Sequence, residues 1–496
     1  MTTYTQTLAE FACTTTFPDL PTSTVDATRR LVIDTLGCAV GGRAVPSSQA
    51  VTRVMVAGGG PPDATVLVGG ERLSLTGAVY LNAHYANALD AEETIRHSGH
   101  LAAATVPPSL AVAERLGATG SEFLAAVAIG FDVAARVALS LRPLDTTEDG
   151  RVVMSPVSGS SWAAFAATVA TGRLLGLDAG QMAHAFGLTV ASAPMPISGR
   201  WGVQAAPRPM TKYGLYGAIA EAGVLGALMA HEGMDGYDDI LDGDHGFWRM
   251  TGSRRSDWDC LTDRLGKRWL VEETSYKAFP ACQWAMPALD LFFRLLDSND
   301  LRPDDIDTVE ALVPEAAINK HMADHTVHTV VDGQFSIPHL LALAARGGPP
   351  GPGWHTSEAL QSARVADFAQ RVRVGVYDRA APILADLMRT QGHAHLIPTS
   401  LTVRAGGREF TAVSNTSDAD QWDAIAARDD EVLRAKFRRF CTPALPAAAI
   451  DRALAVADGL EGEPSVDGLV ACLVATPVAS PPRSPNMRAE PGQLSG

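Results

Sequence analysis

The segment ANALDAEETIRHSGHLAAATVPPS places three acids, a threonine, an arginine and two histidines between Asp90 and His100 of an otherwise alanine-rich region. If the preceding helical pattern continues through it, Asp90, Thr94 and His97 share one helix face. Gly99 then offers a break after which His100 can turn inward. A carboxylate beside an imidazole fixes its tautomer and raises its basicity, as a general base near neutral pH requires. A solvated helix end explains the same spacing equally well.

Two lysines precede apolar segments elsewhere in the chain. Lys212, in RPMTKYGLYG, stands before a glycine-rich apolar run, and Lys277, in TSYKAFPACQW, stands before a proline-bounded one. A lysine beside a buried segment can anchor a carboxylate as a point charge. Most lysines so placed only extend their charged end to solvent, so neither one alone establishes a site.

The segment HMADHTVH offers His321, His325 and His328 as possible metal ligands. It lacks the glutamate of HExxH and has no cysteine nearby, which favours a surface or hinge segment. No convincing GxGxxG, GxxxxGK[ST] or GxSxG element occurs, and the glycine-rich AGGGPP follows no clear strand. We therefore expect no metal, nucleotide or flavin cofactor.

Composition restricts the partners. The 496-residue chain has 55 acidic against 40 basic residues, a formal charge of -15 and no Lys/Arg-rich run, which argues against nucleic acid or an anionic membrane. The six cysteines form no CxxC pair, and the N-terminus lacks the pattern of a signal peptide, so we expect a cytoplasmic protein. The run GLYGAIAEAGVLGALMA contains Glu221 and is expected to be a core helix.

The chain is long enough for two hydrophobic cores. Apolar residues at three-to-four spacing predict one helix after another from about residue 20 to 240. β-rich runs then appear, including TSLTVRAGG and REFTAVSN, whose Gly-Gly predicts a hairpin turn. The fold class expected is mainly α, with a large all-helical domain and a smaller α/β lid domain. We place the helical domain at 1–269, the lid at 270–412, a helical return packing on the first domain at 413–475, and a disordered tail at 476–496.

Several segments in order resemble the MmgE/PrpD family over roughly residues 5 to 460. They are LVIDTLGCAVGG, NAHYANALDAEET, the last histidine of RHSGH, TVPPSLAVAERLGATGSEFLAAVAIGFDVAARV, ATGRLLGL, GVLGALMAHEGMDGYDDILDGDHGFW and YKAFPACQWAMPALD. That family includes 2-methylcitrate dehydratase, cis-aconitate decarboxylase and iminodisuccinate epimerase. The resemblance implies a cofactor-free enzyme, usually a homodimer, with its active site between a helical domain and a lid.

The resemblance also assigns residues. The family's Asp-x-[DE]-[DE]-[TS] motif falls on Asp90, Glu92, Glu93 and Thr94, with His100 as the histidine that follows. The family's two lysines match Lys212 and Lys277, which would supply the local positive charge for a small polycarboxylate. Glu93 and His97 are further candidates for substrate binding.

Two family histidines are missing. Counting along the motifs places Val157 and Leu215 where family members commonly carry histidine. A site refilled with apolar side chains should accept a less polar substrate than citrate or aconitate, such as a β-hydroxy acid with an alkyl arm.

The function expected is a cofactor-independent dehydratase, similar to 2-methylcitrate dehydratase, that abstracts a proton α to a carboxylate and eliminates a β-hydroxyl. His100 would be the general base or acid, Asp90 would orient it, and Thr94 would hydrogen-bond the substrate or a catalytic side chain. Decarboxylation of a cis-aconitate-like acid and epimerisation stay open. A non-catalytic carboxylate-binding homologue is the alternative from another class, and a metal-dependent hydrolase is the least favoured.

Overall fold

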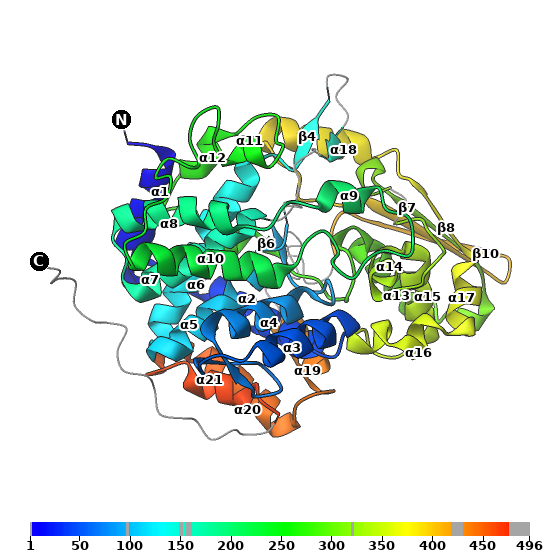
Figure 1. The fold of residues 1–496 in the computed structure, drawn as a ribbon. Coiled ribbons are helices and arrows are strands. Elements are labelled where there is room, and N and C mark those ends of the chain that lie inside the picture. The colour runs from blue at the N-terminus through cyan, green and yellow to red at the C-terminus, as the bar shows by residue number, and fades with distance from the viewer. Residues whose placement is uncertain are drawn as a thin grey trace, which may run out of the picture.

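The computed structural model describes residues 2–95, 99–147, 152–154, 161–318, 322–417 and 430–475. Two separate hydrophobic cores organise them, one built mainly from the helices before residue 276 and one from residues 278–405. In Figure 1 the helices of the first core fill one side of the molecule and a small sheet with its helices fills the other. The expected fold class, mainly α with a smaller α/β part, is confirmed.

The first core is a packed set of helices. The longer ones are α1 (Tyr4–Thr14), α2 (Thr22–Gly42), α3 (Pro46–Gly58), α4 (Leu75–Asn87), α5 (Val106–Leu116), α6 (Gly120–Ser140), α7 (Ala164–Leu175), α8 (Ala179–Ser192) and α10 (Tyr216–His231). Shorter helices are α11 (Phe247–Met250) and α12 (Trp258–Thr262), whereas Trp201 of the short helix α9 (Ser198–Gly202) packs against the second core. Two short antiparallel pairs join them, β1 (Ala64–Thr65) with β2 (Arg72–Leu73) and β4 (Leu144–Thr146) with β5 (Val152–Met154).

Glycine allows α10 to pack closely on its neighbours α4, α7 and α8. A Cβ on Gly223 would lie 2.3 Å from the Ala164 carbonyl oxygen of α7, a distance that no side chain tolerates. This apolar run is a core helix, as expected from the sequence. Of the described helices, α6 alone is long and apolar enough to cross a membrane, but 94% of its apolar stretch is buried inside the protein. Its burial makes α6 a core helix too.

The second core surrounds a four-stranded sheet of order β10-β9-β7-β8. Its strands are β7 (Ile306–Val313), β8 (Val372–Val376), β9 (Thr399–Ala405) and β10 (Arg408–Ser414). β7 pairs parallel to β8 and antiparallel to β9. The β9–β10 turn contains Gly406 and Gly407 with φ of 55° and 74°, so the hairpin predicted from Gly-Gly is confirmed.

Helices precede this sheet and connect its strands. They are α13 (Met286–Ser298), α14 (Val330–Phe335), α15 (Ile337–Arg346), α16 (Ser357–Leu360), α17 (Ala363–Ala369) and α18 (Ala380–Gln391). We call residues 286–414 the small domain. After it, α19 (Asp430–Cys441), α20 (Ala447–Asp458) and α21 (Asp467–Cys472) follow, and α19 packs along α2 in the helical part. Figure 1 shows α19–α21 on the side of α2–α5, away from the sheet.

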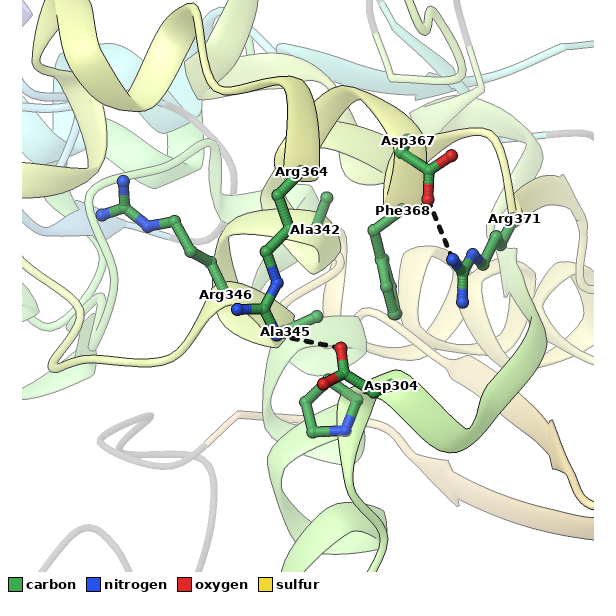
Figure 2. Close-up of a pocket in the computed structure, with 9 residues that line it drawn as sticks. Asp304, Ala342, Ala345, Arg346, Arg364, Asp367, Phe368 and Arg371 are labelled. Atoms are coloured by element: carbon green, nitrogen blue, oxygen red, sulfur yellow. Dashed lines mark hydrogen bonds and ion pairs between the residues drawn. The ribbon is translucent and has the colours of Figure 1, made fainter.

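A shallow pocket in the small domain lies between α15, α17 and the start of β7 (Figure 2). Three arginines line it, but Arg364 pairs with Asp304 at 2.9 Å and Arg371 pairs with Asp367 at 2.9 Å. Its volume of about 30 Å³ is far below the roughly 300–1,000 Å³ of typical ligand sites. The side chains that could take part in a reaction lie elsewhere, where the two cores meet.

Candidate active site

The chain leaves α4 before it reaches the acidic segment. α4 ends at Asn87, Ala88 caps it, and Asp90 has a left-handed backbone with φ of 54°. The expectation that Asp90, Thr94 and His97 share one helix face is therefore wrong, because the helix does not continue. We call residues 88–94 the acid loop; its side chains are buried at the junction of the two cores.

A short strand pair brings Lys277 to this loop. β3 (Thr94–Ile95) pairs antiparallel with β6 (Thr274–Ser275), so that Thr94 faces Ser275. Lys277 follows two residues later and its Nζ donates to the Asp90 carbonyl oxygen at 2.6 Å, with the Asp90 Oδ2 at 3.7 Å. The two residue pairs of this short sheet thus bring together Asp90 and Lys277, which are 187 residues apart in the sequence.

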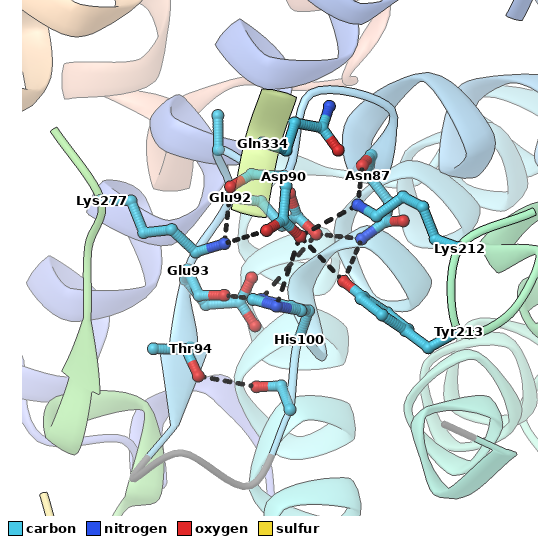
Figure 3. A network of polar contacts seen from close by, with 12 residues as sticks. Asn87, Asp90, Glu92, Glu93, Thr94, His100, Lys212, Tyr213, Lys277 and Gln334 are labelled. Atoms are coloured by element: carbon cyan, nitrogen blue, oxygen red, sulfur yellow. Dashed lines mark hydrogen bonds and ion pairs between the residues drawn. The ribbon is translucent and has the colours of Figure 1, made fainter. Parts of the chain in front are cut away.

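Lys212 reaches the same carboxylate from the segment before α10. Its Nζ donates to Asp90 Oδ1 at 2.9 Å and to the Asn87 carbonyl oxygen at 2.8 Å. The Tyr213 hydroxyl also donates to Asp90 Oδ1 at 2.9 Å. Figure 3 shows these side chains converging on Asp90.

These neighbours decide the charge of Asp90. Burial alone would raise the pKa of its carboxyl, but the ammonium groups of Lys212 and Lys277 together hold that pKa well below its ordinary value. Asp90 is an anion compensated by two ammonium groups. Each lysine has three N–H donors, and in the described part of the chain Lys212 uses two of them and Lys277 one in hydrogen bonds. Lys212 thus has one N–H and Lys277 two that make none of these hydrogen bonds.

His100 turns into the site after Gly99, whose φ of 132° only glycine adopts readily; the helix that Gly99 was expected to interrupt has already ended at Asn87. Its Nδ1 hydrogen-bonds the Glu93 carbonyl oxygen, which can only accept, so Nδ1 carries the proton and Nε2 a lone pair that takes no hydrogen bond from the described residues. Nε2 lies 3.8 Å from Asp90 Oδ1, too far for a hydrogen bond. The structure therefore differs from the expectation that Asp90 orients His100: the Glu93 carbonyl does so.

Burial and the nearby Lys277 charge lower the pKa of His100, against the opposing effect of Glu92 and Asp90. The imidazole is thus neutral at pH 7. Its ring stacks on Tyr213 with centroids 6.0 Å apart. Burial raises the pKa of Tyr213 well above its usual value, so its hydroxyl keeps the proton that it donates to Asp90.

The other predicted side chains hold the loop. Glu93 Oε1 accepts from the backbone N–H groups of Leu101 and Ala102 at 2.5 and 2.8 Å, and burial together with Glu92 raises the Glu93 pKa to about 8. Glu93 is fully buried, and these hydrogen bonds connect its side chain to the backbone that follows His100; its contact with substrate stays a prediction. The Thr94 hydroxyl donates to the Gly99 carbonyl oxygen at 3.3 Å, which links the described residues on either side of 96–98.

Some predicted residues lie outside the site or outside the described residues. His97, Val157, His321 and the tail 476–496 belong to the segments that the structure does not describe. His325 hydrogen-bonds the Val372 carbonyl oxygen at 3.0 Å. Leu215 stands directly before α10 and is half-buried.

Asp90, Glu92 and His100 are the one group of possible metal ligands in the described residues. Asp90 lies on the Nε2 side of the imidazole at 3.8 Å and Glu92 on the Nδ1 side at 3.9 Å, where the Glu93 carbonyl already occupies Nδ1. Two ammonium groups also lie within 4 Å of the Asp90 carboxylate. This donor set fits a divalent cation poorly, because the lysines would repel it.

Sequence reasoning missed four members of this network. Asn87 donates to both Glu92 Oε1 and the Tyr213 hydroxyl. Gln334 of the small domain and Lys436 of α19 donate to backbone carbonyls of the acid loop. Tyr213 stands next to Lys212 and packs against both hydrophobic cores, so its position beside a candidate lysine was the one available signal.

Fold and site together define a helical enzyme-like architecture with a small α/β domain and a buried Asp-Lys-Lys-His cluster between them. Residues 6–258 match the MmgE/PrpD N-terminal domain and residues 279–461 match the MmgE/PrpD C-terminal domain. The chain belongs to the MmgE/PrpD family, and the resemblance seen in the sequence is confirmed.

Curated relatives are more distant. The cis-aconitate decarboxylase of Aspergillus terreus is 26% identical over 235 residues, which cover 46% of each chain. The cis-aconitate decarboxylase-like protein oryM of Aspergillus oryzae is 26% identical over 268 residues, 51% of this chain and 53% of that protein. The chain thus spans about half the length of the curated relatives it matches.

Proposed function

We propose that the protein is a cofactor-independent lyase that dehydrates a β-hydroxy carboxylate, either 2-methylcitrate or a less polar acid with an alkyl arm. The observation that carries the proposal is the state of His100. A neutral imidazole with its Nε2 lone pair free lies beside two buried ammonium groups, which is what removal of a proton α to a carboxylate requires.

Each step assigns a bond and a proton. The substrate carboxylate binds the remaining N–H donors of Lys212 and Lys277. His100 Nε2 takes the α-proton, and the C–H electrons form an enolate whose charge the two lysines stabilise. The electron pair then returns to form the C=C bond as the β C–O bond breaks. The leaving hydroxide takes a proton from the imidazolium, which releases water and restores neutral His100.

Aromatic rings adjoin Lys212 through Tyr213, whose ring centroid lies 5.0 Å from Lys212 Nζ. Trp201 and Phe335 pack edge-on with centroids 4.7 Å apart, and Trp201 packs on Tyr213 at 5.7 Å. Aromatic side chains packed on the neighbour of Lys212 support an acid with an alkyl arm, in line with Leu215 at a position where family members commonly have histidine.

Decarboxylation of a cis-aconitate-like acid is the second candidate, and the curated relatives support it. In that reaction the C–C bond to CO2 breaks, and the carbanion left behind must receive a proton. A neutral His100 has no proton on Nε2 to give, so the imidazole geometry favours the dehydratase over this candidate. Epimerisation and a non-catalytic carboxylate-binding role remain as outcomes of the test.

The proposal includes a homodimer, which family membership suggests, in the cytoplasm, which the scattered cysteines suggest. Sedimentation of the purified protein tests the oligomeric state, and a monomer at micromolar concentration would contradict it.

The test of function is proton NMR in D2O, with chelator-treated protein and a panel of hydroxy and unsaturated di- and tricarboxylates, including alkyl-substituted ones. A new vinyl signal with α-deuterium exchange supports the dehydratase. CO2 loss without prior exchange at the α-carbon supports the decarboxylase, and exchange alone supports an epimerase. His184→Ala is the matched control for His100→Ala, because His184 is a partly exposed histidine bonded to the Gly236 carbonyl oxygen on the surface of α8. Silence across the panel with folded protein overturns the proposal in favour of a binding role.

A further inference from the structure

The backbone of the acid loop is held by side chains from four distant segments. Four carbonyl oxygens at the end of α4 and in the loop each accept a hydrogen bond from one of them (Figure 3 shows three of the donors). The Asn87 carbonyl accepts from Lys212 at 2.8 Å, that of Ala88 from Gln334 at 2.9 Å, that of Asp90 from Lys277 at 2.6 Å, and that of Ala91 from Lys436 at 2.5 Å. The mechanism above uses Lys212 and Lys277 but not the other two.

Lys436 approaches from the side of the loop that faces α2. It belongs to α19, and its side chain is 2% exposed. Besides the Ala91 carbonyl, its Nζ binds Asp34 Oδ1 of α2 at 2.6 Å, and the Asp34 side chain is fully buried. A third buried ammonium group, more than 340 residues along the chain from the loop, thus holds the residue next to Asp90.

Stability alone does not explain this lysine. A buried ion pair contributes little net free energy compared with well-packed apolar side chains, because both charges lose their hydration. What an apolar pair cannot do is donate to the Ala91 carbonyl. Asp90 has a left-handed backbone, which a non-glycine residue keeps only where its surroundings fix it. Lys277 and Lys436 fix the two carbonyls that follow this strained φ.

We propose that Lys436 is a positioning residue for the reaction: by holding the Ala91 carbonyl it fixes the backbone of Asp90, and through Asp90 it fixes the two substrate-binding lysines. This inference rests on the proposed function. Its second consequence, that Lys436 restrains the backbone of the acid loop, does not depend on any substrate.

Three variants separate positioning from ion-pair stability. Asp34→Asn keeps an acceptor oxygen for Lys436 and leaves the Ala91 contact in place, but it removes the charge partner. Lys436→Met removes both contacts. The double variant Asp34→Asn with Lys436→Met removes both charges and the Ala91 contact together. Arg438→Met is the matched control on the same helix, because Arg438 makes an exposed ion pair with Asp451.

Kinetics give the first readout. Lys436→Met and the double variant should lower kcat roughly 10- to 100-fold with KM changed less than about threefold, since a small misplacement of reacting groups costs this much. Asp34→Asn and Arg438→Met should retain kcat. The double variant should unfold at a higher denaturant concentration than Lys436→Met, because it leaves no unpaired buried charge. Recovery of kcat together with stability in the double variant would show that Lys436 is only structural.

Hydrogen exchange gives a readout that needs no activity. Amides of residues 88–95 should exchange at least tenfold faster in the double variant than in Asp34→Asn, even where the two unfold at similar denaturant concentrations. Unchanged exchange in the double variant overturns the inference. Faster exchange in a protein that acts on no acid of the panel would instead refute the proposed function and leave the role of Lys436 in the loop standing.

Discussion

Replacing Asp90 with asparagine removes one charge from the centre of the site and keeps its shape. The amide oxygen can still accept from Lys212 and Tyr213, so the change isolates electrostatics. At an effective dielectric constant of about 20, unit charges at the 2.9 Å of Lys212 and the 3.7 Å of Lys277 attract by roughly 6 and 4.5 kcal/mol. Desolvation offsets much of this, and breaking a buried pair by removing one partner costs about 3–5 kcal/mol net. We expect the free energy of unfolding to fall by that amount at pH 7.

Urea denaturation followed by circular dichroism measures this loss. Asp367→Asn is the matched control, because Asp367 is 70% exposed and pairs with Arg371 at the same 2.9 Å. An exposed pair is worth only about 0–1 kcal/mol, so the control should change little. A loss below about 1 kcal/mol in Asp90→Asn would refute the argument that Asp90 is the main compensating charge of the two lysines.

The same substitution moves the pH profile. The Asp90 charge raises the pKa of His100, against burial and Lys277, which lower it. Removing that charge should lower the His100 pKa further, so that the acid limb of kcat/KM shifts to lower pH. A shift to higher pH would contradict the electrostatics described here.

Three further predictions concern Tyr213, three buried histidines and chelation. Tyr213→Phe removes a donor to a charged carboxylate and should lower the free energy of unfolding by about 1–3 kcal/mol, measured by urea denaturation; an unchanged value would mean that the Asp90 contact contributes nothing. Acid should destabilise the protein. Burial lowers the pKa of His84 to about 4, of His339 to about 3 and of His355 to about 4. Because these histidines have a pKa near 6.5 in the unfolded chain, the unfolded chain binds more protons than the folded protein as the pH falls below 6.5. Each should cost roughly 2 kcal/mol between pH 7 and pH 5, and a stability that is constant over this range would be the contrary result. Exhaustive chelation should leave activity unchanged in a direct rate assay, because ammonium groups occupy the oxygens of Asp90; loss of activity that zinc or iron restores would refute this.

Local patterns allowed much of the fold to be predicted. The hairpin followed from two adjacent glycines, and the core helix α10 followed from an apolar run interrupted by a glutamate and glycines. The helix α4 was extended too far because ANALDAEET keeps a helical composition, and no glycine or proline marks the point where Asp90 takes its left-handed φ. Backbone strain that distant side chains maintain leaves no local signal.

The residues of the site could be predicted better than the hydrogen bonds between them. The acids, His100 and both lysines could be selected from charge in apolar surroundings and from family resemblance. That the Glu93 carbonyl orients His100, or that Lys436 reaches Ala91 from α19, depends on three-dimensional contacts between segments up to 345 residues apart. Such contacts carry no spacing that a single sequence reveals.

The central claim is that neutral His100 removes the α-proton of a lysine-bound carboxylate. The most direct test is the rate of α-proton exchange into D2O for an acid that the wild-type protein processes, compared in His100→Ala and His184→Ala. We expect His100→Ala to slow exchange about 100-fold or more and His184→Ala to leave it unchanged. A loss below tenfold in His100→Ala would contradict the account and place the base elsewhere.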